Sequence, residues 1–202
     1  TRVDSMRLME GGAEGDRHLD PLSARKLLLA SGASYAALGL PPQALRENLL
    51  LDDDIDHLPS GAVLQIGDQA RVRLMFACEA CARLDLHGAR LAATVGARRG
   101  VLARVVEGGV IRQGDPVRDL GKRYAPWPDD WRRRIAQVLD AVPPDAVLEY
   151  AQLARLAGIQ SSYCRAFPRL LHALGPAYAE KAIAARTLTA RPRWTGAGLF
   201  DR

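Results

Sequence analysis

The fold is decided by residues 63–76, which read VLQIGDQARVRLMF. Three of the first four are apolar, Gly67-Asp68 is a turn signal, and the apolar positions that follow alternate with Arg71 and Arg73. Alternation with a period of two is typical of a half-buried strand. The stretch therefore predicts two short strands separated by a turn.

More strand signals follow downstream. Residues 101–106 are another strand, with Arg104 among apolar residues, Gly108-Gly109 marks a tight turn, and residues 110–112 begin a returning strand. Short strands joined by glycine turns are typical of a barrel or closed sheet. We therefore expect a β-rich barrel that includes residues 61–118.

Upstream, residues 25–30 form a short run that is apolar after Arg25-Lys26 and is followed by Ser31-Gly32, as expected for another strand. Residues 34–38 predict a short helix, with Ser31 or Ser34 as its cap and Gly39 at its end. The first 60 residues are thus expected to mix loops with short elements.

The pattern changes after residue 118. Glycine and proline are frequent in residues 119–128, which we interpret as a linker open to limited proteolysis. Beyond it an apolar stripe with helical spacing begins at Trp131, and two more helices are expected, at residues 149–157 and from about Ser161. The sequence therefore predicts a mixed α+β chain, with residues 1–118 as the barrel domain, 119–128 as the linker and 129–202 as a helical module.

Composition narrows the class of protein. The 202 residues include only three cysteines, which argues against a disulfide-built secreted fold. No run approaches the roughly 20 apolar residues of a membrane span, and the N-terminus lacks the features of a signal peptide, so we expect a cytoplasmic protein without a membrane partner. The net charge of +5 permits a polyanionic partner, but an arginine-rich composition also follows from a GC-rich genome. The oligomeric state stays open.

The sharpest local feature is Cys78-Glu79-Ala80-Cys81, at the predicted end of a strand. A structural zinc site needs four ligands, and the sequence has no second pair with this spacing. A redox pair is expected to open a helix in a β-α-β frame, which the pattern here does not predict. A third interpretation is two small residues buried at a strand end, because free cysteine packs as a hydrophobe. The motif alone leaves these interpretations open.

Four short motifs follow one another in the first 118 residues. They are Gly15-Asp16-Arg17-His18, Leu45-Arg46-Glu47-Asn48-Leu49, Cys81-Ala82-Arg83-Leu84, and Arg99-Gly100-Val101 with the later Gly108-Gly109 and Gly114-Asp115-Pro116-Val117. In their order and spacing they resemble the MOSC family, named for the C-terminal domain of molybdenum-cofactor sulfurases. The second motif departs from the family pattern, because Arg46 stands where glycine is usual.

The resemblance implies that Cys81 carries sulfur or binds a molybdenum cofactor (molybdopterin) through its thiolate, with Cys78 as an auxiliary cysteine. A thiolate is both a nucleophile and a metal ligand, which is consistent with either role. The residues implied to bind the cofactor are Arg17, Arg46, Asn48, Arg83 and Arg99, since a pterin phosphate favours arginine. The implied activities are sulfur transfer with a sulfur donor protein and molybdenum-dependent reduction, and whether the chain is an enzyme stays open.

The C-terminal part carries a second resemblance. Val142-Pro143-Pro144, Tyr150-Ala151-Gln152-Leu153-Ala154 and Arg165-Ala166-Phe167 are similar to the DNA-binding domain of alkylguanine-DNA alkyltransferases and their relatives. In that family the tyrosine pushes on a phosphate and the arginine replaces a flipped base, which implies such roles for Tyr150 and Arg165. Arg169 is expected to share a helix face with Arg165 and to reach a phosphate of DNA, as part of a helix-turn-helix module.

Two departures weigh against that function. The family's Pro-Cys-His-Arg active site is replaced by Gly175-Pro176-Ala177-Tyr178, so alkyl transfer is excluded on this pattern. Pro168 falls inside the expected reader helix, where it would kink or end it. Two interpretations stay open for residues 129–202: a nucleic-acid-binding module, or a helical part that covers the barrel or mediates a dimer.

Overall fold

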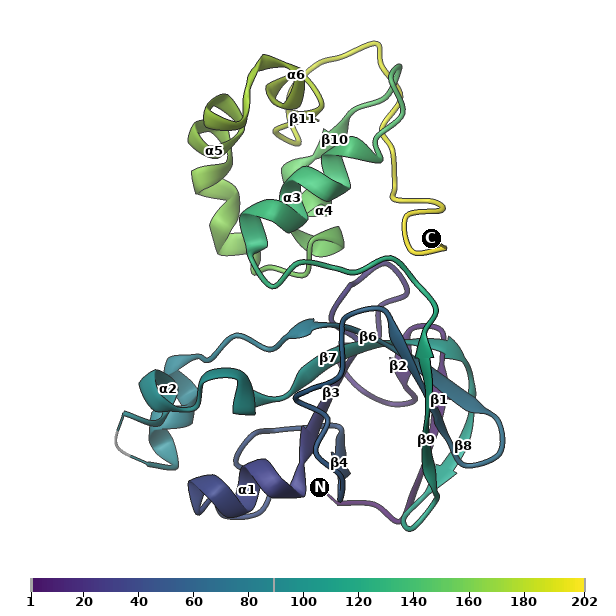
Figure 1. The fold of residues 1–202 in the computed structure, drawn as a ribbon. Helices are drawn as coiled ribbons and strands as arrows, with labels where there is room; N and C mark the ends of the chain where they lie inside the picture. Colours follow the sequence, from purple (N-terminus) through teal and green to yellow (C-terminus); the bar gives the residue numbers. More distant parts are fainter. Residues whose placement is uncertain (1, 89, 202) are drawn as a thin grey trace. The chain divides into compact units, whose positions relative to one another are not determined.

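The chain divides into two compact units (Figure 1). A computed structural model describes residues 2–88 and 90–201, except for the side chains of Arg83 and Ala97. One unit comprises Thr1–Pro21 and Arg25–Trp127, and the other comprises Leu22–Ala24 and Pro128–Arg202. The first contains the two larger sheets, and the second is mainly helical.

The strands of the first unit form two sheets. They are β1 (Ser5–Met9), β2 (Gly12–Ala13), β3 (Leu27–Ser31), β4 (Leu49–Leu51), β5 (Ala62–Ile66), β6 (Ala70–Ala77), β7 (Val101–Glu107), β8 (Gly109–Arg112) and β9 (Val117–Lys122). One sheet has the order β4-β3-β7-β6-β5-β9 and the other β2-β1-β8. The mixed α+β class is therefore confirmed. The larger sheet is a curled half-barrel with edge strands β4 and β9 (Figure 1). It is therefore open, whereas the sequence predicts a closed barrel.

The turn at Gly108 does not produce the expected hairpin. Strand β7 pairs antiparallel with β6, but β8 pairs with β1 in the other sheet. Gly108 permits this crossing, because a Cβ there would lie 2.7 Å from the Leu8 carbonyl oxygen. The glycine signal thus locates the break between β7 and β8, but it carries no information about the partner strand.

Strand β6 is buried on both faces, and not half-buried as its alternation predicts. Arg71 is exposed, whereas Arg73 is only 2% exposed. The Arg73 guanidinium donates to the Ala125 carbonyl oxygen over 2.7 Å and stacks on the Tyr124 ring, 4.4 Å from its centre. These contacts let a charged residue occupy a buried position. The opposite face packs into a core that includes Leu27, Leu64, Leu74 and Val105.

Short helices lie at the ends of β3 and β6. They are α1 (Gly32–Leu38), the 3-10 helices η1 (Ala82–Leu86) and η2 (Gly96–Arg99), and α2 (Leu91–Thr94). Ser31 caps α1 by accepting the Ser34 N–H over 3.1 Å, and Gly39 ends it with a φ of 61°, as predicted. A second core cluster joins these helices to β3, and it consists of Ala30, Leu45, Leu84, Leu91 and Val95.

Residues 119–128 differ from the expected linker. Residues 119–122 continue β9, which pairs antiparallel with β5. The N–H groups of Arg123 and Tyr124 donate to the Gly61 carbonyl oxygen over 2.9 and 3.2 Å. Trp127 is 3% exposed, and its N–H donates to Ser60 Oγ over 2.7 Å. The first unit therefore extends to Trp127, beyond the expected boundary at residue 118.

The second unit is built from short helices and a small parallel sheet. Its elements are α3 (Trp131–Asp140), β10 (Leu148–Glu149), α4 (Tyr150–Leu156), η3 (Ser161–Ala166), α5 (Phe167–Leu174), α6 (Pro176–Ala179) and β11 (Ala182–Ile183), with β10 paired to β11. Asp130 caps α3 by accepting the N–H groups of Arg132 and Arg133 over 2.8 and 3.0 Å. Over residues 2–88 and 90–201, no helix is long and apolar enough to cross a membrane.

The described residues of the second unit do not show the expected helix-turn-helix. Helix α4 ends near Gly158 as predicted, but residues 161–166 form a 3-10 helix and α5 begins only at Phe167. Pro168 stands in the first turn of α5, where its missing N–H is tolerated, so it starts a helix and does not kink one. Arg165 and Arg169 consequently lie on two successive helices, and not on one helix face as expected.

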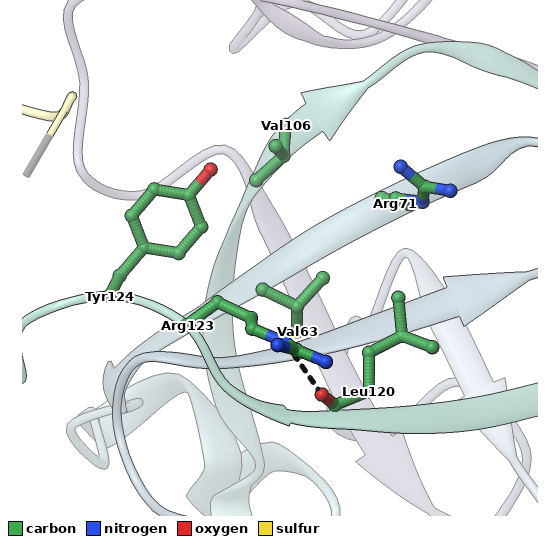
Figure 2. A pocket seen from close by; sticks show the side chains of 6 residues that line it. All are labelled: Val63, Arg71, Val106, Leu120, Arg123 and Tyr124. Atoms are coloured by element: carbon green, nitrogen blue, oxygen red, sulfur yellow. Dashed lines mark hydrogen bonds between the residues drawn. The ribbon is translucent and has the colours of Figure 1, made fainter.

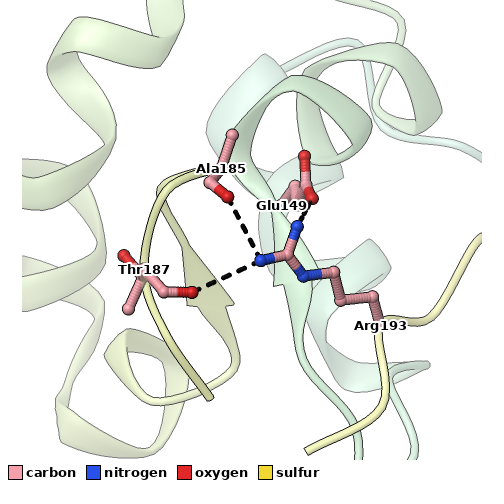
Figure 3. Close-up of polar contacts among 4 residues, drawn as sticks. All are labelled: Glu149, Ala185, Thr187 and Arg193. Carbon is pink, nitrogen blue, oxygen red and sulfur yellow. Dashed lines mark hydrogen bonds and ion pairs between the residues drawn. The ribbon is translucent and has the colours of Figure 1, made fainter.

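Arg193 ties the C-terminal segment to the small sheet of this unit (Figure 3). Its guanidinium pairs with the Glu149 carboxylate at the end of β10. It also donates to the carbonyl oxygens of Ala185 and Thr187 over 3.1 and 3.3 Å. One side chain thus joins three segments that are separate in sequence.

Candidate functional site

Cys78 is fixed where β6 and β7 meet. Its N–H donates to the Gly100 carbonyl oxygen over 2.8 Å, and its thiol is buried, with 5% of the residue exposed. Gly100 adopts a φ of 101°, and a Cβ there would lie 2.2 Å from the Leu29 carbonyl oxygen. Only glycine therefore allows β3, β6 and β7 to come together behind the cysteine.

Cys81 is the more accessible of the two cysteines. It is half-buried and occupies the cap position before η1, with its carbonyl accepting the Leu84 N–H over 3.0 Å. Leu84 is 2% exposed within the second core cluster, which anchors the start of η1. Both cysteines precede the helix, whereas a thioredoxin-like pair opens one. The predicted Arg83 side chain lies outside the described residues.

Arg99 is a buried cation beside this cysteine pair. It is 7% exposed, and its guanidinium donates to the Leu45 carbonyl oxygen. Its Nε is buried and has no hydrogen-bond partner among the residues that the structure describes. Burial raises the pKa of the Cys78 thiol, and the charges of Arg99 and Arg25 oppose that shift. A donor without a partner and a positive charge therefore lie close to Cys78.

The segment with Arg46 and Asn48 is held at both ends. The Tyr35 hydroxyl donates to Glu47 Oε2 over 2.6 Å and accepts the Leu45 N–H over 3.1 Å. Burial and the Glu47 carboxylate raise the pKa of Tyr35, so it stays a neutral donor. Arg46 is exposed with a φ of 55°, in the left-handed region that favours glycine. The residue at which this chain departs from the family pattern is therefore a strained one.

Asn48 links this segment to the predicted loop at Asp16. Its Oδ1 accepts the Leu28 N–H over 2.8 Å, and its Nδ2 donates to Asp16 Oδ2 over 3.0 Å. Arg17 is exposed and donates through Nε to His18 Nε2 over 3.1 Å. The Asn48 side chain thus fixes the loop at Asp16 relative to the backbone of β3. Arg17 has no described contact with the cysteines.

The structure brings part of the predicted site together. A backbone hydrogen bond joins Cys78 to Gly100, the Arg99 guanidinium donates to the Leu45 carbonyl oxygen, and Asn48 connects the same segment to the loop at Asp16. Sequence reasoning missed Tyr35 and Arg25. Neither residue lies in a motif, and only the folded chain brings them near Arg99 and Cys78.

A protein-held metal centre is not evident in this region. In the part of the chain that the structure describes, no group of three or more His, Cys, Asp or Glu side chains could hold a metal ion. Any metal at Cys81 would therefore need ligands from elsewhere.

The predicted nucleic-acid residues lie in the second unit. The Tyr150 ring packs edge-on against Phe167 with centres 5.7 Å apart, and its carbonyl oxygen accepts the Cys164 thiol over 3.4 Å. Tyr150 thus contributes to packing, because Phe167 is fully buried. Arg165 and Arg169 are both exposed.

Solved structures with a similar fold exist. A crystal structure of a hypothetical protein matches with 23% identity and a TM-score of 0.54, covering 84% of both chains. YiiM from Escherichia coli matches with 20% identity and a TM-score of 0.50, covering 84% of this chain and 88% of YiiM. YiiM from Geobacillus stearothermophilus matches with 17% identity and a TM-score of 0.50, covering 83% and 84%. At these identities the similarity concerns the fold alone.

Family assignment comes from the sequence of the first unit. No curated protein matches the chain. The family model of the MOSC domain matches residues 15–118, which is half of the chain and includes the four motifs around Cys78, Cys81 and Arg99. The chain therefore belongs to the MOSC domain family.

Proposed function

We propose that this protein handles sulfur or a molybdenum cofactor through the thiol of Cys81. The observation that carries the proposal is the half-exposed Cys81 close to the buried Cys78, on whose thiol the charge of Arg99 acts. The Nε of Arg99 is buried and has no hydrogen-bond partner within the described part of the chain. A thiolate near positive charge is a suitable nucleophile for sulfur and a suitable soft ligand. The buried Cys78 is auxiliary in this proposal, since burial raises its pKa.

Sulfur transfer would proceed by nucleophilic attack. The Cys81 thiolate attacks the outer sulfur of a persulfide on a donor protein, and a new S–S bond forms as the donor's S–S bond breaks. The donor leaves as a thiolate, and Cys81 then carries the persulfide, so atoms and charge balance without a further reductant. Arg99 would stabilise negative charge near this position.

The residues present also fit a molybdenum cofactor. The unpartnered Nε of Arg99 is a buried donor suited to an anionic group such as a pterin phosphate, and Arg46 and Arg17 are exposed cations for the same purpose. Cys81 offers one soft ligand, which suits a metal that arrives with its own ligands. When bound, such a cofactor supplies a redox-active metal for reductive chemistry. Asn48 acts as a positioning residue, because Leu28 and Asp16 occupy its amide.

We predict that Cys81 is the most reactive of the three cysteines. Iodoacetamide should label it at least about ten times faster than Cys78 at neutral pH, because the thiolate is the reacting form and burial raises the pKa of Cys78. Peptide mapping of the parent and of Cys81→Ser, Cys78→Ser and Cys164→Ser over a range of pH measures this. Equal, slow labelling of Cys78 and Cys81 would contradict the assignment.

A second measurement determines what the protein carries, independently of how fast its cysteines react. Protein purified without added thiol is examined by intact mass and metal analysis, before and after exposure to a small-molecule persulfide donor. We expect one additional sulfur atom, or bound molybdenum, in the parent and in Cys164→Ser but not in Cys81→Ser. Retention of either at the parental level by Cys81→Ser overturns the proposal.

Nucleic-acid binding by the second unit is a second candidate. Residues 128–202 contain eleven Lys and Arg but seven Asp and Glu, and Arg165 and Arg169 are exposed. Arg169→Ala should weaken binding to all DNA sequences and lower the salt slope by about one, as expected for a phosphate contact. Arg165→Ala should instead remove any preference for distorted duplex. Titrations at low salt, with Arg112→Ala as control, test this, and no binding at micromolar protein eliminates the candidate.

A further inference from the structure

The face of the larger sheet that points away from its core carries a row of cations. Opposed residues of antiparallel strands project from the same face, and Arg73 lies opposite Arg104 in the pairing of β6 with β7. Leu27 lies opposite Ala103 in the pairing of β3 with β7, which places Lys26 next to Arg104. All three side chains are buried: Lys26 is 3% exposed, Arg104 is 8% exposed and Arg73 is 2% exposed. This row crosses three neighbouring strands.

The row leads into a pocket on the same face (Figure 2). Val63 lies opposite Arg73 in the pairing of β5 with β6, so it continues the row by one strand. The pocket has a volume of about 360 Å³, within the usual range for small-molecule sites. Its lining consists of Val63, Val106, Leu120, Arg71, Arg123 and Tyr124. It is separate from the cysteine site, which lies beyond the end of β6.

Two polar groups of the pocket keep hydrogen-bonding capacity. Arg123 donates through Nε to the Leu120 carbonyl oxygen over 2.9 Å, which orients the guanidinium. Its two terminal nitrogens and the Tyr124 hydroxyl have no partner among the described residues. Arg71 forms a salt bridge with Glu107 over 3.0 Å, so the carboxylate offsets its positive charge in the pocket.

The ring of Tyr124 is held in place from behind. The Arg73 guanidinium stacks on it, 4.4 Å from the ring centre, and the Tyr124 N–H is bound by the Gly61 carbonyl oxygen. The hydroxyl therefore stands in a defined position beside an apolar surface. Aliphatic side chains of Val63, Val106 and Leu120 complete that surface.

We propose that this pocket binds a small organic anion, with a carboxylate or phosphate head on an apolar body. Arg123 and the Tyr124 hydroxyl bind the head group, and the aliphatic residues contact the body. The buried cations behind the pocket favour the negative sign of the ligand. A guanidinium with free terminal N–H groups suits the two oxygens of a carboxylate or phosphate.

Four probes define the ligand class. Phenyl phosphate and benzoate combine a charged head with an apolar ring, inorganic phosphate lacks the ring, and benzyl alcohol lacks the charge. We expect saturable binding of phenyl phosphate or benzoate by calorimetry and by amide NMR shifts near Arg123, weakening as salt is added. Inorganic phosphate and benzyl alcohol should each bind at least about tenfold more weakly. The proposal is overturned if inorganic phosphate or benzyl alcohol binds as tightly as phenyl phosphate and benzoate, or if no probe saturates the protein at millimolar concentration.

Variants locate the site. Arg123→Gln should weaken phenyl phosphate binding about tenfold or more, and Tyr124→Phe a few-fold while keeping the ring on Arg73. Arg112→Gln removes an exposed arginine from β8, outside the pocket, and should leave affinity unchanged. Thermal unfolding confirms that each variant is folded. If Arg123→Gln and Arg112→Gln bind alike, the pocket is not the site.

Discussion

At the residue scale, Lys26 illustrates how burial changes the chemistry of one amine. It is 3% exposed, and its ammonium group donates to the Glu10 carbonyl oxygen. Burial, and then the charge of Arg104, lower the pKa of Lys26 from 10.5 to about 8. The folded protein therefore releases this proton earlier than the unfolded chain.

This difference predicts a pH dependence of stability. Between about pH 8 and pH 10.5 the unfolded chain holds the Lys26 proton and the folded protein does not, so this residue makes stability rise with pH. The raised pKa values of Cys78 and Tyr35 act in the opposite sense. Urea unfolding of the parent and of Lys26→Met across this window isolates the lysine as the difference between the two curves.

An exposed lysine supplies the control for that measurement. Lys122 lies exposed in β9, so Lys122→Met should follow the parental pH curve. If Lys26→Met also follows it, the Lys26 amine titrates in the folded protein as it does in the unfolded chain.

At the scale of elements, Arg134 joins the start of α3 to the end of α4. It is completely buried and donates through Nε to the Ala157 carbonyl oxygen over 2.9 Å. Its terminal nitrogen donates to the carbonyl oxygens of Pro128 and Asp129 over 3.1 and 2.6 Å. Ala157 stands at the C-terminal end of α4, where carbonyl oxygens lack a partner within the helix, so Arg134 supplies that partner.

Replacing Arg134 should therefore destabilise the second unit. Arg134→Met keeps the aliphatic part of the side chain but removes the donor to the carbonyl of the buried Ala157, which costs about 1–3 kcal/mol. Arg133→Met alters an exposed neighbour on the same helix and should change stability by less than about 0.5 kcal/mol. Chemical unfolding followed by far-UV circular dichroism compares the two, and equal effects would show that burial of Arg134 contributes nothing.

Sequence patterns predicted individual elements better than their partners. Local propensity predicts the strand that leads to Ser31, the cap that Ser31 provides for α1, and the end of α1 at Gly39. Each of these is confirmed. The pairing of β8 with β1 depends on how closely Gly108 approaches Leu8, which is a tertiary contact. The 3-10 helix at residues 161–166 was missed for a different reason, because its apolar spacing fits an α-helix equally well.

At the scale of the whole molecule, the connection between the units leads to a revised prediction about proteolysis. Lys122 and Arg123 are exposed, but β9 and the bonds to Gly61 hold their backbone. Arg186 lies in the run 184–190, whose side chains are all exposed. Limited trypsin treatment followed by mass spectrometry should therefore detect cleavage at Arg186 before cleavage at residues 122–123. The opposite order would mean that residues 119–127 behave as the flexible linker that their composition suggests.

The candidate site was only partly accessible from sequence. The family motifs indicated Cys81, Cys78 and Arg99, and the chain brings Cys78 and Arg99 close enough for their charges to interact. Arg73, by contrast, lies in the same alternating pattern as Arg71, yet one is buried and the other exposed. The difference depends on Tyr124 and Ala125, which are some fifty positions further along the chain and could not be placed beside Arg73 by periodicity.

The edge strand β4 has a consequence for how copies of this protein behave at high concentration. Its sequence is Leu-Leu-Leu, it pairs only with β3 among the described strands, and Leu50 is 53% exposed. The unpaired backbone groups of such an apolar edge can pair with a strand of another molecule, which promotes aggregation. Asp52, Asp53 and Asp54 follow directly and are all exposed. Like charges beside an apolar edge strand disfavour its pairing between copies, so we expect the colloidal stability of the protein to depend on these three carboxylates.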